Sequence, residues 1–292
     1  MSLHMLHLPV RQRELLACGR EHRLVSDANA VDLGYLVHAL LARALGERAA
    51  KPFDVQAERA AETRVPGRLV APRPLTVLAY AADDIATLHA HAKQIGDDLA
   101  LAAIAWEDAD SKPMPPFAAG QRLGFRVRVC PTLRVGKRHP CFEPGAEVDP
   151  YLALIAREVA ERATAQPGAC ELTLRREVVD AAPPREIVYR DWLCDRIGVA
   201  AAVGDARLAS LRDARLWRRG EPGESAAAKM HGRPRPRLGR RAAMGRREAV
   251  FEGTLEVRDA GAFRDLLARG VGRHRAFGFG MLLLRSVDSN RC

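Results

Sequence analysis

The glycine-rich segment GVGRHRAFGFG, residues 270–280, carries more information about the fold than any other stretch of the chain. Its four glycines permit tight turns and let a ligand come close to the backbone. The free backbone N–H groups of such a loop, together with Arg273 and Arg275, suit a phosphate group. No Rossmann-type unit surrounds the loop, so a dinucleotide site is disfavoured. A simple glycine-rich turn before a last strand is the alternative interpretation.

Around this loop, the second half of the chain alternates between strand and helix patterns. The pattern predicts a strand at 122–133, helices at 151–164 and 186–197, a strand at 251–257, a helix at 262–269 and a strand at 277–285. Within 122–133, apolar residues alternate with Arg126 and Arg128, which indicates one buried face and one cationic face.

The first half shows the same alternation. It predicts a strand at 5–9, a helix at 33–48, strands at 68–70 and 75–80, a helix from Asp83 or Asp84 to about Leu99, and a strand at 100–105. Asp32 precedes the helix at 33–48 and can cap it.

The order of elements predicts the fold class. Strand, helix, two strands, helix and strand is the order of a ferredoxin-like or RRM-like fold. We therefore predict an α+β protein with two tandem ferredoxin-like domains, at residues 1–108 and 120–292. The acidic and proline-rich residues 107–119 form the linker. Insertions near 140–184 and 218–247 add a helical and arginine-rich part to the second domain.

The positive charge of the chain is concentrated in one stretch. The chain of 292 residues has a formal net charge of +10, and residues 212–247 hold twelve basic and three acidic residues. That stretch accounts for +9 of the charge and leaves the remainder nearly neutral. A local cationic arm on a globular protein indicates a polyanionic partner, most often a nucleic acid.

Other features exclude several classes of protein. Hydrophobic residues make up 48% of the chain, which is enough for a sizeable core and argues against general disorder. The sequence contains neither an apolar run of membrane-spanning length nor a signal-peptide core near its start, so we expect no membrane association. The six cysteines are widely spread without a CxxC pair. We therefore expect a cytoplasmic protein with free thiols.

Several motifs resemble one known family. The segment FRDLLARGVGRHRAFGFGMLLL at 263–284 resembles the C-terminal signature of CRISPR repeat-cleaving endoribonucleases, in particular the CasE branch. The segments FEGTLEV at 251–257, YRDWL at 189–193 and the stretch 125–138 ending in GKR also fit this branch. The resemblance covers most of the second half. It implies two tandem ferredoxin-like domains and metal-independent cutting of a CRISPR repeat transcript at the base of a hairpin.

The family resemblance also implies catalytic residues in the first half. CasE-type proteins often carry a Tyr-x-x-His pair on the first helix, and Tyr35 and His38 match that pair. On the helix at 33–48 both side chains lie away from the apolar face, so both can face a groove. His22 and Arg23 precede this helix as further candidates: Arg23 could hold the scissile phosphate, and His22 could replace His38 in its role. A polar connection without function is the alternative for these two residues.

The expected chemistry needs no metal and no cofactor. A 2′-hydroxyl attacks the adjacent phosphate in line, a base removes its proton, and an acid protonates the leaving 5′ oxygen. His38 can serve as either acid or base near neutral pH, and Tyr35 can orient the 2′-hydroxyl or donate to the phosphate. The sequence contains no CxxC pair that would indicate a metal site.

Basic and glycine residues are the candidates for RNA binding. The arm contains no aromatic residue between 218 and 249 for base stacking, so contacts to duplex phosphates are expected. The residues predicted to bind RNA are Arg126, Arg128, Lys137, Arg138, Lys229, Arg233, Arg235, Arg237, Arg240, Arg241, Arg246, Arg247, Gly270, Gly272, Arg273, His274 and Arg275.

Together with these residues, the family resemblance implies an endoribonuclease that binds a CRISPR repeat stem-loop and cuts precursor crRNA on the 3′ side of the hairpin. The expected ends are a 5′-hydroxyl and a 2′,3′-cyclic phosphate. The protein is expected to keep the mature crRNA and, through it, to join other CRISPR effector subunits. The insertion and the arm are compatible with a divergent branch such as type IV. A non-catalytic RNA-hairpin-binding subunit is the alternative function, and a DNA-binding accessory protein is a weaker one.

Overall fold

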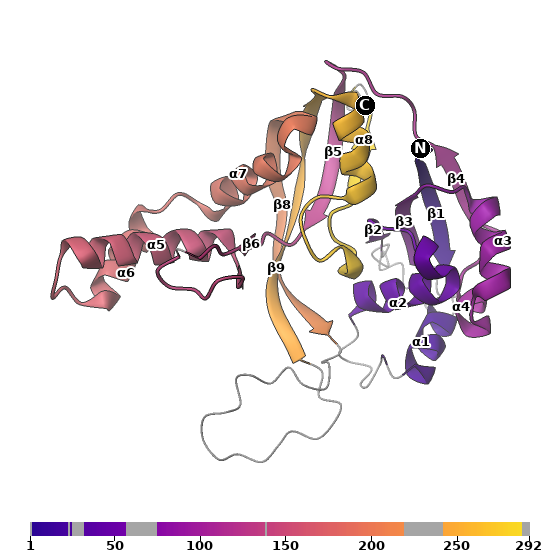
Figure 1. The fold of residues 1–292 in the computed structure, drawn as a ribbon, viewed down its shortest axis with the longest axis horizontal. Helices are drawn as coiled ribbons and strands as arrows, with labels where there is room; N and C mark the ends of the chain where they lie inside the picture. Colours follow the sequence, from indigo (N-terminus) through magenta and orange to yellow (C-terminus); the bar gives the residue numbers. More distant parts are fainter. Residues whose placement is uncertain are drawn as a thin grey trace, which may run out of the picture.

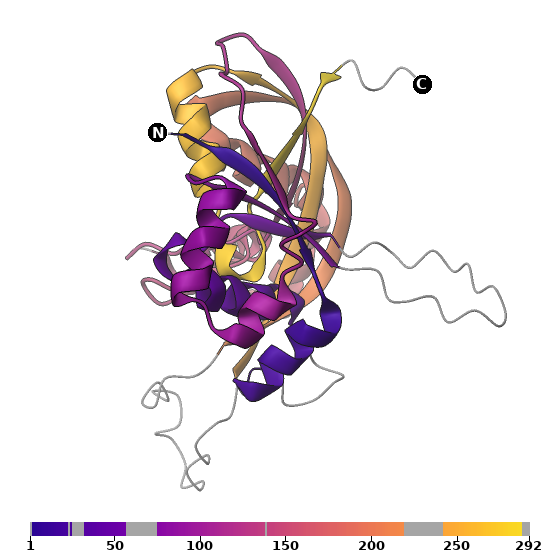
Figure 2. The ribbon, with the colours of Figure 1, turned by 90° about the vertical axis from the view of Figure 1, so that its right-hand side faces the viewer.

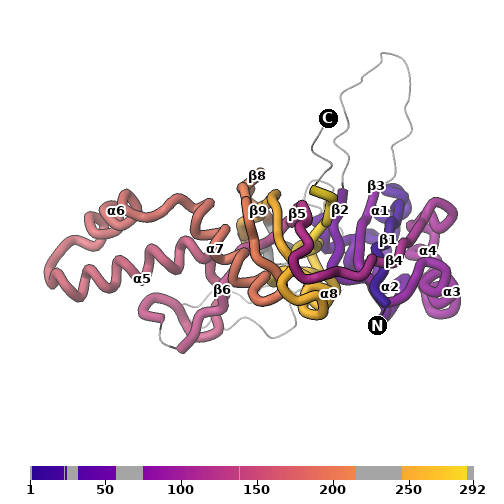
Figure 3. Tube along the Cα trace, turned by 90° about the horizontal axis from the view of Figure 1, so that it is seen from above, coloured from indigo at the N-terminus to yellow at the C-terminus, as the bar shows by residue number. Residues whose placement is uncertain are grey.

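The chain forms two β-sheets that lie side by side, with a helical extension at one end (Figures 1 and 3). The computed structural model describes residues 2–22, 24, 32–56, 75–137, 139–218 and 242–287. The N-terminal sheet lies at one end of the molecule, the C-terminal sheet in the middle, and helices α5 (Pro150–Ala165) and α6 (Glu171–Ala181) at the other end.

The N-terminal sheet is antiparallel, with the strand order β2-β3-β1-β4. Its strands are β1 (His4–Val10), β2 (Phe53–Gln56), β3 (Leu75–Ala81) and β4 (Asp110–Pro113). Its helices are α1 (Gln12–Glu21), α2 (Leu33–Leu45), α3 (Ile85–Ile95) and α4 (Asp98–Ala103). The first strand along the chain is thus central, and the last strand lies at its edge.

The C-terminal sheet repeats this topology, with the antiparallel order β10-β5-β9-β8. Its strands are β5 (Arg122–Val129), β8 (Ala201–Arg218), β9 (Ala242–Val257) and β10 (Leu282–Arg285). Helices α7 (Arg185–Ile197) and α8 (Ala260–Arg269) connect them, and a small pair, β6 (Leu133–Arg134) with β7 (Glu147–Val148), precedes α5. Helices α3 and α8 lie on the same side of the two sheets (Figure 2).

Both halves therefore have the ferredoxin-like strand order, and the predicted fold class is confirmed. The helix expected after Asp32 is also confirmed. The Asp32 side chain accepts a hydrogen bond from the Tyr35 backbone N–H at 3.0 Å, as an N-cap residue does. The regular helix ends at Leu45, and its last expected turn is a 3-10 turn at Gly46–Arg48.

The structure corrects several predicted elements. Residues expected to form a strand at 100–105 are mostly helical, because the Asp97 side chain caps α4 and the following residues, DLALAA, favour helix. The predicted linker 107–119 contains strand β4, which pairs with β1. Helix α1 and strand β2 were not predicted, and the strand expected at 68–70 lies outside the described residues.

Strands β8 and β9 are much longer than the sequence pattern indicated. They span 18 and 16 residues, whereas the prediction covered only 251–257. Beyond Val129 of β5 they continue as a two-stranded ribbon, so both ends of the basic arm, 212–218 and 242–247, are paired strands. Residues 219–241 of the arm lie outside the described part of the chain.

Apolar side chains from both halves share one core. Leu3 and Tyr80 of the N-terminal half belong to the same buried cluster as Phe125, Phe251 and Phe263. The buried Tyr80 hydroxyl donates to the backbone carbonyl of Leu282 at 2.9 Å, which links β3 to β10. The described residues include no helix with the length and apolar character needed to cross a membrane.

Candidate active site and nucleic-acid interface

Helix α2 holds the predicted catalytic pair at the boundary between the two halves. Leu36, Val37 and Leu40 point into the N-terminal core, whereas Tyr35 and His38 are half-buried at the edge of that apolar face. The sequence pattern placed both side chains away from the apolar face, whereas in the structure both are half-buried and Tyr35 packs in an apolar cluster. Neither side chain is freely solvated, and residues of the C-terminal half cover Tyr35.

The cover is the glycine-rich loop, residues 270–280. The Tyr35 and Phe277 rings are stacked, with centroids 5.6 Å apart and planes inclined by 25°. Gly34 allows this contact, because a Cβ atom at that position would lie 2.1 Å from the Phe277 carbonyl oxygen. Gly34 and Tyr35 in one segment and Phe277 in a distant one thus bring the predicted catalytic helix and the predicted phosphate loop together.

The protonation of His38 is shifted by this position. Burial, followed by the positive charge of Lys51, lowers the pKa of the His38 imidazole below its ordinary value. Its Nδ1 atom is buried and has no hydrogen-bond partner among the described residues. The neutral imidazole is therefore favoured near pH 7, and that form can accept a proton.

Two basic residues of the glycine loop, Arg273 and His274, are held by one carboxylate. Glu147 of β7 lies 2.7 Å from the Arg273 Nε and 3.2 Å from the His274 Nε2. Arg246 of β9 also reaches it, at 3.6 Å. His274 has a left-handed backbone with φ 61°, which is uncommon for a residue other than glycine. Three residues predicted to bind RNA thus surround Glu147.

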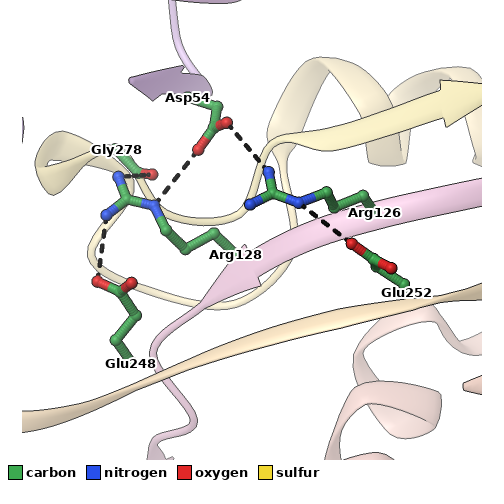
Figure 4. Close-up of polar contacts among 6 residues, drawn as sticks. All are labelled: Asp54, Arg126, Arg128, Glu248, Glu252 and Gly278. Atoms are coloured by element: carbon green, nitrogen blue, oxygen red, sulfur yellow. Dashed lines mark hydrogen bonds and ion pairs between the residues drawn. The ribbon is translucent and has the colours of Figure 1, made fainter. Parts of the chain in front are cut away.

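The arginines of β5 connect the two halves (Figure 4). The Arg128 Nε lies 3.3 Å from the buried Asp54 carboxylate of β2, and its Nη1 lies 3.2 Å from Glu248. The Arg128 Nη2 donates to the Gly278 carbonyl at 2.7 Å, so this side chain also holds the glycine loop. Arg126 pairs with Asp54 at 3.6 Å and with Glu252 at 3.6 Å.

His22 lies in a different cluster from Tyr35 and His38. Its Nε2 is 2.8 Å from the Asp97 carboxylate, which Arg43 also approaches at 3.5 Å. The Cys18 Sγ, His22 and Asp97 offer ligand atoms within 4.8 Å of one another. The positive charge of Arg43 and the raised pKa of the buried Cys18 thiol both oppose a cation there.

The remaining predicted site residues divide into two groups. Lys137 is exposed, and Arg247 pairs with Asp213 at 2.8 Å on the β8–β9 ribbon. The other predicted residues, for which the structure gives no position, are Arg23, Arg138, Lys229, Arg233, Arg235, Arg237, Arg240 and Arg241.

Sequence analysis missed the acidic partners of this region. Nothing in the sequence singles out Asp54 or Glu147 from the other carboxylates, because each meets its arginines only through the sheet topology. The sequence pattern placed Phe277 only at the start of the strand predicted at 277–285. Its position in a short 3-10 turn, Arg275–Phe277, places its ring against Tyr35.

Two ferredoxin-like halves that meet at a glycine-rich loop define the chain as a tandem ferredoxin-like protein. The family model described as CRISPR associated protein matches residues 3–286, so the chain belongs to that family. This agrees with the resemblance found in the sequence motifs. No curated protein matches the chain by sequence.

Solved structures share the fold at low sequence identity. CRISPR endoribonuclease Cse3 bound to a 19-nucleotide RNA has a TM-score of 0.52 and 18% identity, over 97% of this chain and 99% of that chain. Thermus thermophilus Cse3, bound to an RNA representing a pre-cleavage complex, has a TM-score of 0.51 and 17% identity, over 98% of this chain and 100% of that chain. At this identity, the similarity establishes the common fold.

Proposed function

We propose that this chain is a metal-independent endoribonuclease that binds a CRISPR repeat stem-loop and cleaves precursor crRNA on the 3′ side of the hairpin. One observation carries the proposal: Tyr35 and His38 lie on a helix that packs directly against the glycine-rich loop. Membership of the CRISPR-associated family and the fold shared with RNA-bound Cse3 support the assignment of RNA as substrate.

The residues supply the chemistry as follows. Neutral His38 removes the proton of the 2′-hydroxyl, whose oxygen then bonds to phosphorus while the bond to the 5′ oxygen breaks. The leaving 5′ oxygen takes up a proton from solvent water. The Tyr35 hydroxyl orients the 2′-hydroxyl or donates to a phosphate oxygen. The products carry a 2′,3′-cyclic phosphate and a 5′-hydroxyl. The protein retains the crRNA through its basic surface and meets other effector subunits through that RNA.

The decisive experiment compares His38→Ala with His22→Ala in EDTA, on the repeat RNA of the host's own array. We expect His38→Ala to slow single-turnover cleavage by roughly a hundredfold, the usual scale for loss of a general acid or base. We expect His22→Ala to retain most activity, because His22 pairs with Asp97 in another cluster. Equal activity of His38→Ala and wild type would remove His38 from the site.

A non-catalytic RNA-hairpin-binding subunit is the second candidate. The observation that favours it is the buried Nδ1 of His38, which has no partner among the described residues to orient the ring as a catalytic base is usually oriented. Wild-type protein that binds the repeat hairpin tightly but leaves it uncut under all conditions would establish this function instead.

A further inference from the structure

Five exposed arginines surround a pocket on the outer side of the glycine loop. The pocket has a volume of about 280 Å³. It is lined by Arg134, Arg196, Arg269, Arg273 and Arg275, with Asp195 as the one acidic lining residue. These arginines come from β6, α7, α8 and the loop, which are far apart in the sequence. Only Arg273 and Arg275 were predicted as RNA contacts, so the pocket adds three residues to that set.

Most of these guanidinium groups lack an acidic partner. Arg273 pairs with Glu147, but no ion pair joins Arg134, Arg196, Arg269 or Arg275 to an acid in the described part of the chain. Arg275 instead donates to the Arg269 backbone carbonyl at the C-terminal end of α8. Arginine has five N–H donors, so this bond leaves most of the Arg275 donors available. Such a concentration of unneutralised charge favours an anion.

Trp192 packs against the glycine loop at Gly272, one of the residues that line the pocket. Trp192 of α7 is buried, and its indole N–H donates to the Thr132 carbonyl at 3.1 Å. The Arg196 guanidinium lies 5.8 Å from the Trp192 ring centroid. Gly272 has φ 76°, and a Cβ atom there would lie 2.9 Å from the Trp192 ring. The loop can therefore lie on Trp192 only with glycine at this position, which constrains the backbone of the loop beside the pocket.

The glycine loop borders the pocket with one residue and helix α2 with another. Arg275 lines the pocket, whereas Phe277, two residues later, stacks on Tyr35. Two residues span at most about 7 Å of chain, so the pocket and the catalytic helix border the same short turn. A single RNA strand can therefore contact both.

We propose that this pocket binds a backbone phosphate of the repeat RNA outside the scissile position, and that it contributes affinity without taking part in the cleavage step. The ligand chemistry is a phosphodiester held by Arg134, Arg196 and Arg269. The inference rests on the proposed function for its RNA ligand. A small free phosphate compound has the same chemistry, and the experiment separates the two sources.

The test compares Arg134→Gln/Arg196→Gln with Arg175→Gln/Arg176→Gln. The control pair removes the same charge from exposed positions on α6, outside the pocket. For the pocket variant we expect repeat-RNA binding to weaken roughly tenfold, and the slope of log K against log salt to fall by about 0.7 to 0.9, the value for one phosphate that the protein no longer neutralises. The cleavage rate at saturating protein stays within about twofold of wild type. The control variant keeps the wild-type slope.

Three results would overturn the proposal. An unchanged salt slope in the pocket variant, while wild type still cleaves, would reject the pocket and leave the proposed function intact. A tenfold loss of the saturated cleavage rate would make these arginines part of the chemistry. Inorganic pyrophosphate that binds wild type but not the pocket variant, and that leaves repeat RNA bound to wild type at matched ionic strength, would assign the pocket to a small anion.

If wild type binds the hairpin but never cuts it, the proposed enzymatic function fails, and the salt slopes still test the pocket. Wild type that binds no repeat RNA at all would overturn both.

Discussion

The pH dependence of cleavage tests whether His38 is the base, because the nearby Lys51 influences the pKa of its imidazole. Lys51 lowers the His38 pKa because its positive charge disfavours the imidazolium form. If neutral His38 is the base, activity is lost as the pH falls through this lowered pKa. We expect Lys51→Gln to raise the pKa and move the acidic limb of the single-turnover rate profile to higher pH.

The same pH–rate profile distinguishes whether His38 acts as a general base or as a general acid. A general acid must be protonated, so its titration would control the alkaline limb, and Lys51→Gln would then shift that limb instead. Lys93→Gln is the matched control, because Lys93 lowers the pKa of His89 rather than that of His38. A profile that Lys51→Gln leaves unchanged would contradict a titrating role for His38.

Asp54 is a second residue for which the effect of a substitution on stability can be predicted. Its side chain is 6% exposed and neutralises both Arg126 and Arg128. Asp54→Asn leaves Arg128 partly buried without a full counter-charge, which costs about 3 kcal/mol of unfolding free energy. We expect that loss in urea unfolding. Asp180→Asn, at an exposed ion pair on α6, should cost less than about 1 kcal/mol.

At the residue scale, the sequence indicated the catalytic and basic candidates, but it did not indicate the carboxylates that pair with the basic ones. Tyr35 and His38 could be placed from helical spacing and family resemblance. The roles of Arg126 and Arg128 could not, because the pattern shows only that their side chains share one face of a strand. Whether that face meets RNA or the Asp54 carboxylate depends on β2, a strand that the sequence did not predict.

At the scale of elements, the contact between α2 and the glycine loop controls the site. Gly34→Ala would place a Cβ atom 2.1 Å from the Phe277 carbonyl, so the helix or the loop must move. We expect a loss of about 1 to 3 kcal/mol in stability, as for other overpacked sites, together with at least tenfold slower cleavage.

Gly136→Ala is the control for this contact. A Cβ atom at Gly136 meets nothing within 4 Å, so the substitution should change stability by less than about 0.5 kcal/mol. Cleavage by Gly34→Ala at the wild-type rate would show that the position of the loop against α2 does not matter to the reaction.

Helix and strand periodicity predicted most elements, but it was wrong for a short helix and for the lengths of two long strands. The segment 98–103 was assigned partly to a strand because its apolar run is short, and only the Asp97 cap distinguishes it as helix. Strands β8 and β9 were underestimated because small and basic residues interrupt the apolar alternation. Their pairing with each other, rather than burial, supports these residues in extended form.

At the scale of the whole molecule, the charge distribution predicts how RNA binding responds to salt. Both described ends of the basic arm, 212–218 and 242–247, belong to the β8–β9 ribbon, and the arm holds most of the net charge. We expect Arg233→Ala/Arg235→Ala/Arg237→Ala to weaken repeat-RNA binding and to reduce its salt slope by about 1 for each phosphate that these arginines neutralise. Filter-binding titrations over a salt series measure this slope.

The rate of cleavage at saturating protein provides the control for the arm. It should stay near the wild-type value, because we expect the arm to supply affinity rather than reacting groups. A triple variant with the wild-type slope would make residues 233–237 irrelevant to RNA binding.

The shared core also makes the two halves interdependent as an assembly. Leu3 and Tyr80 are buried in a cluster with residues of the C-terminal half, and the proposed catalytic helix meets the glycine loop across the same boundary. Two fragments separated after β4 would therefore have to recombine before any site exists. Their activity would follow mass action, rising with the product of the fragment concentrations until association saturates. Dilution would then switch off the reaction without changing a single residue.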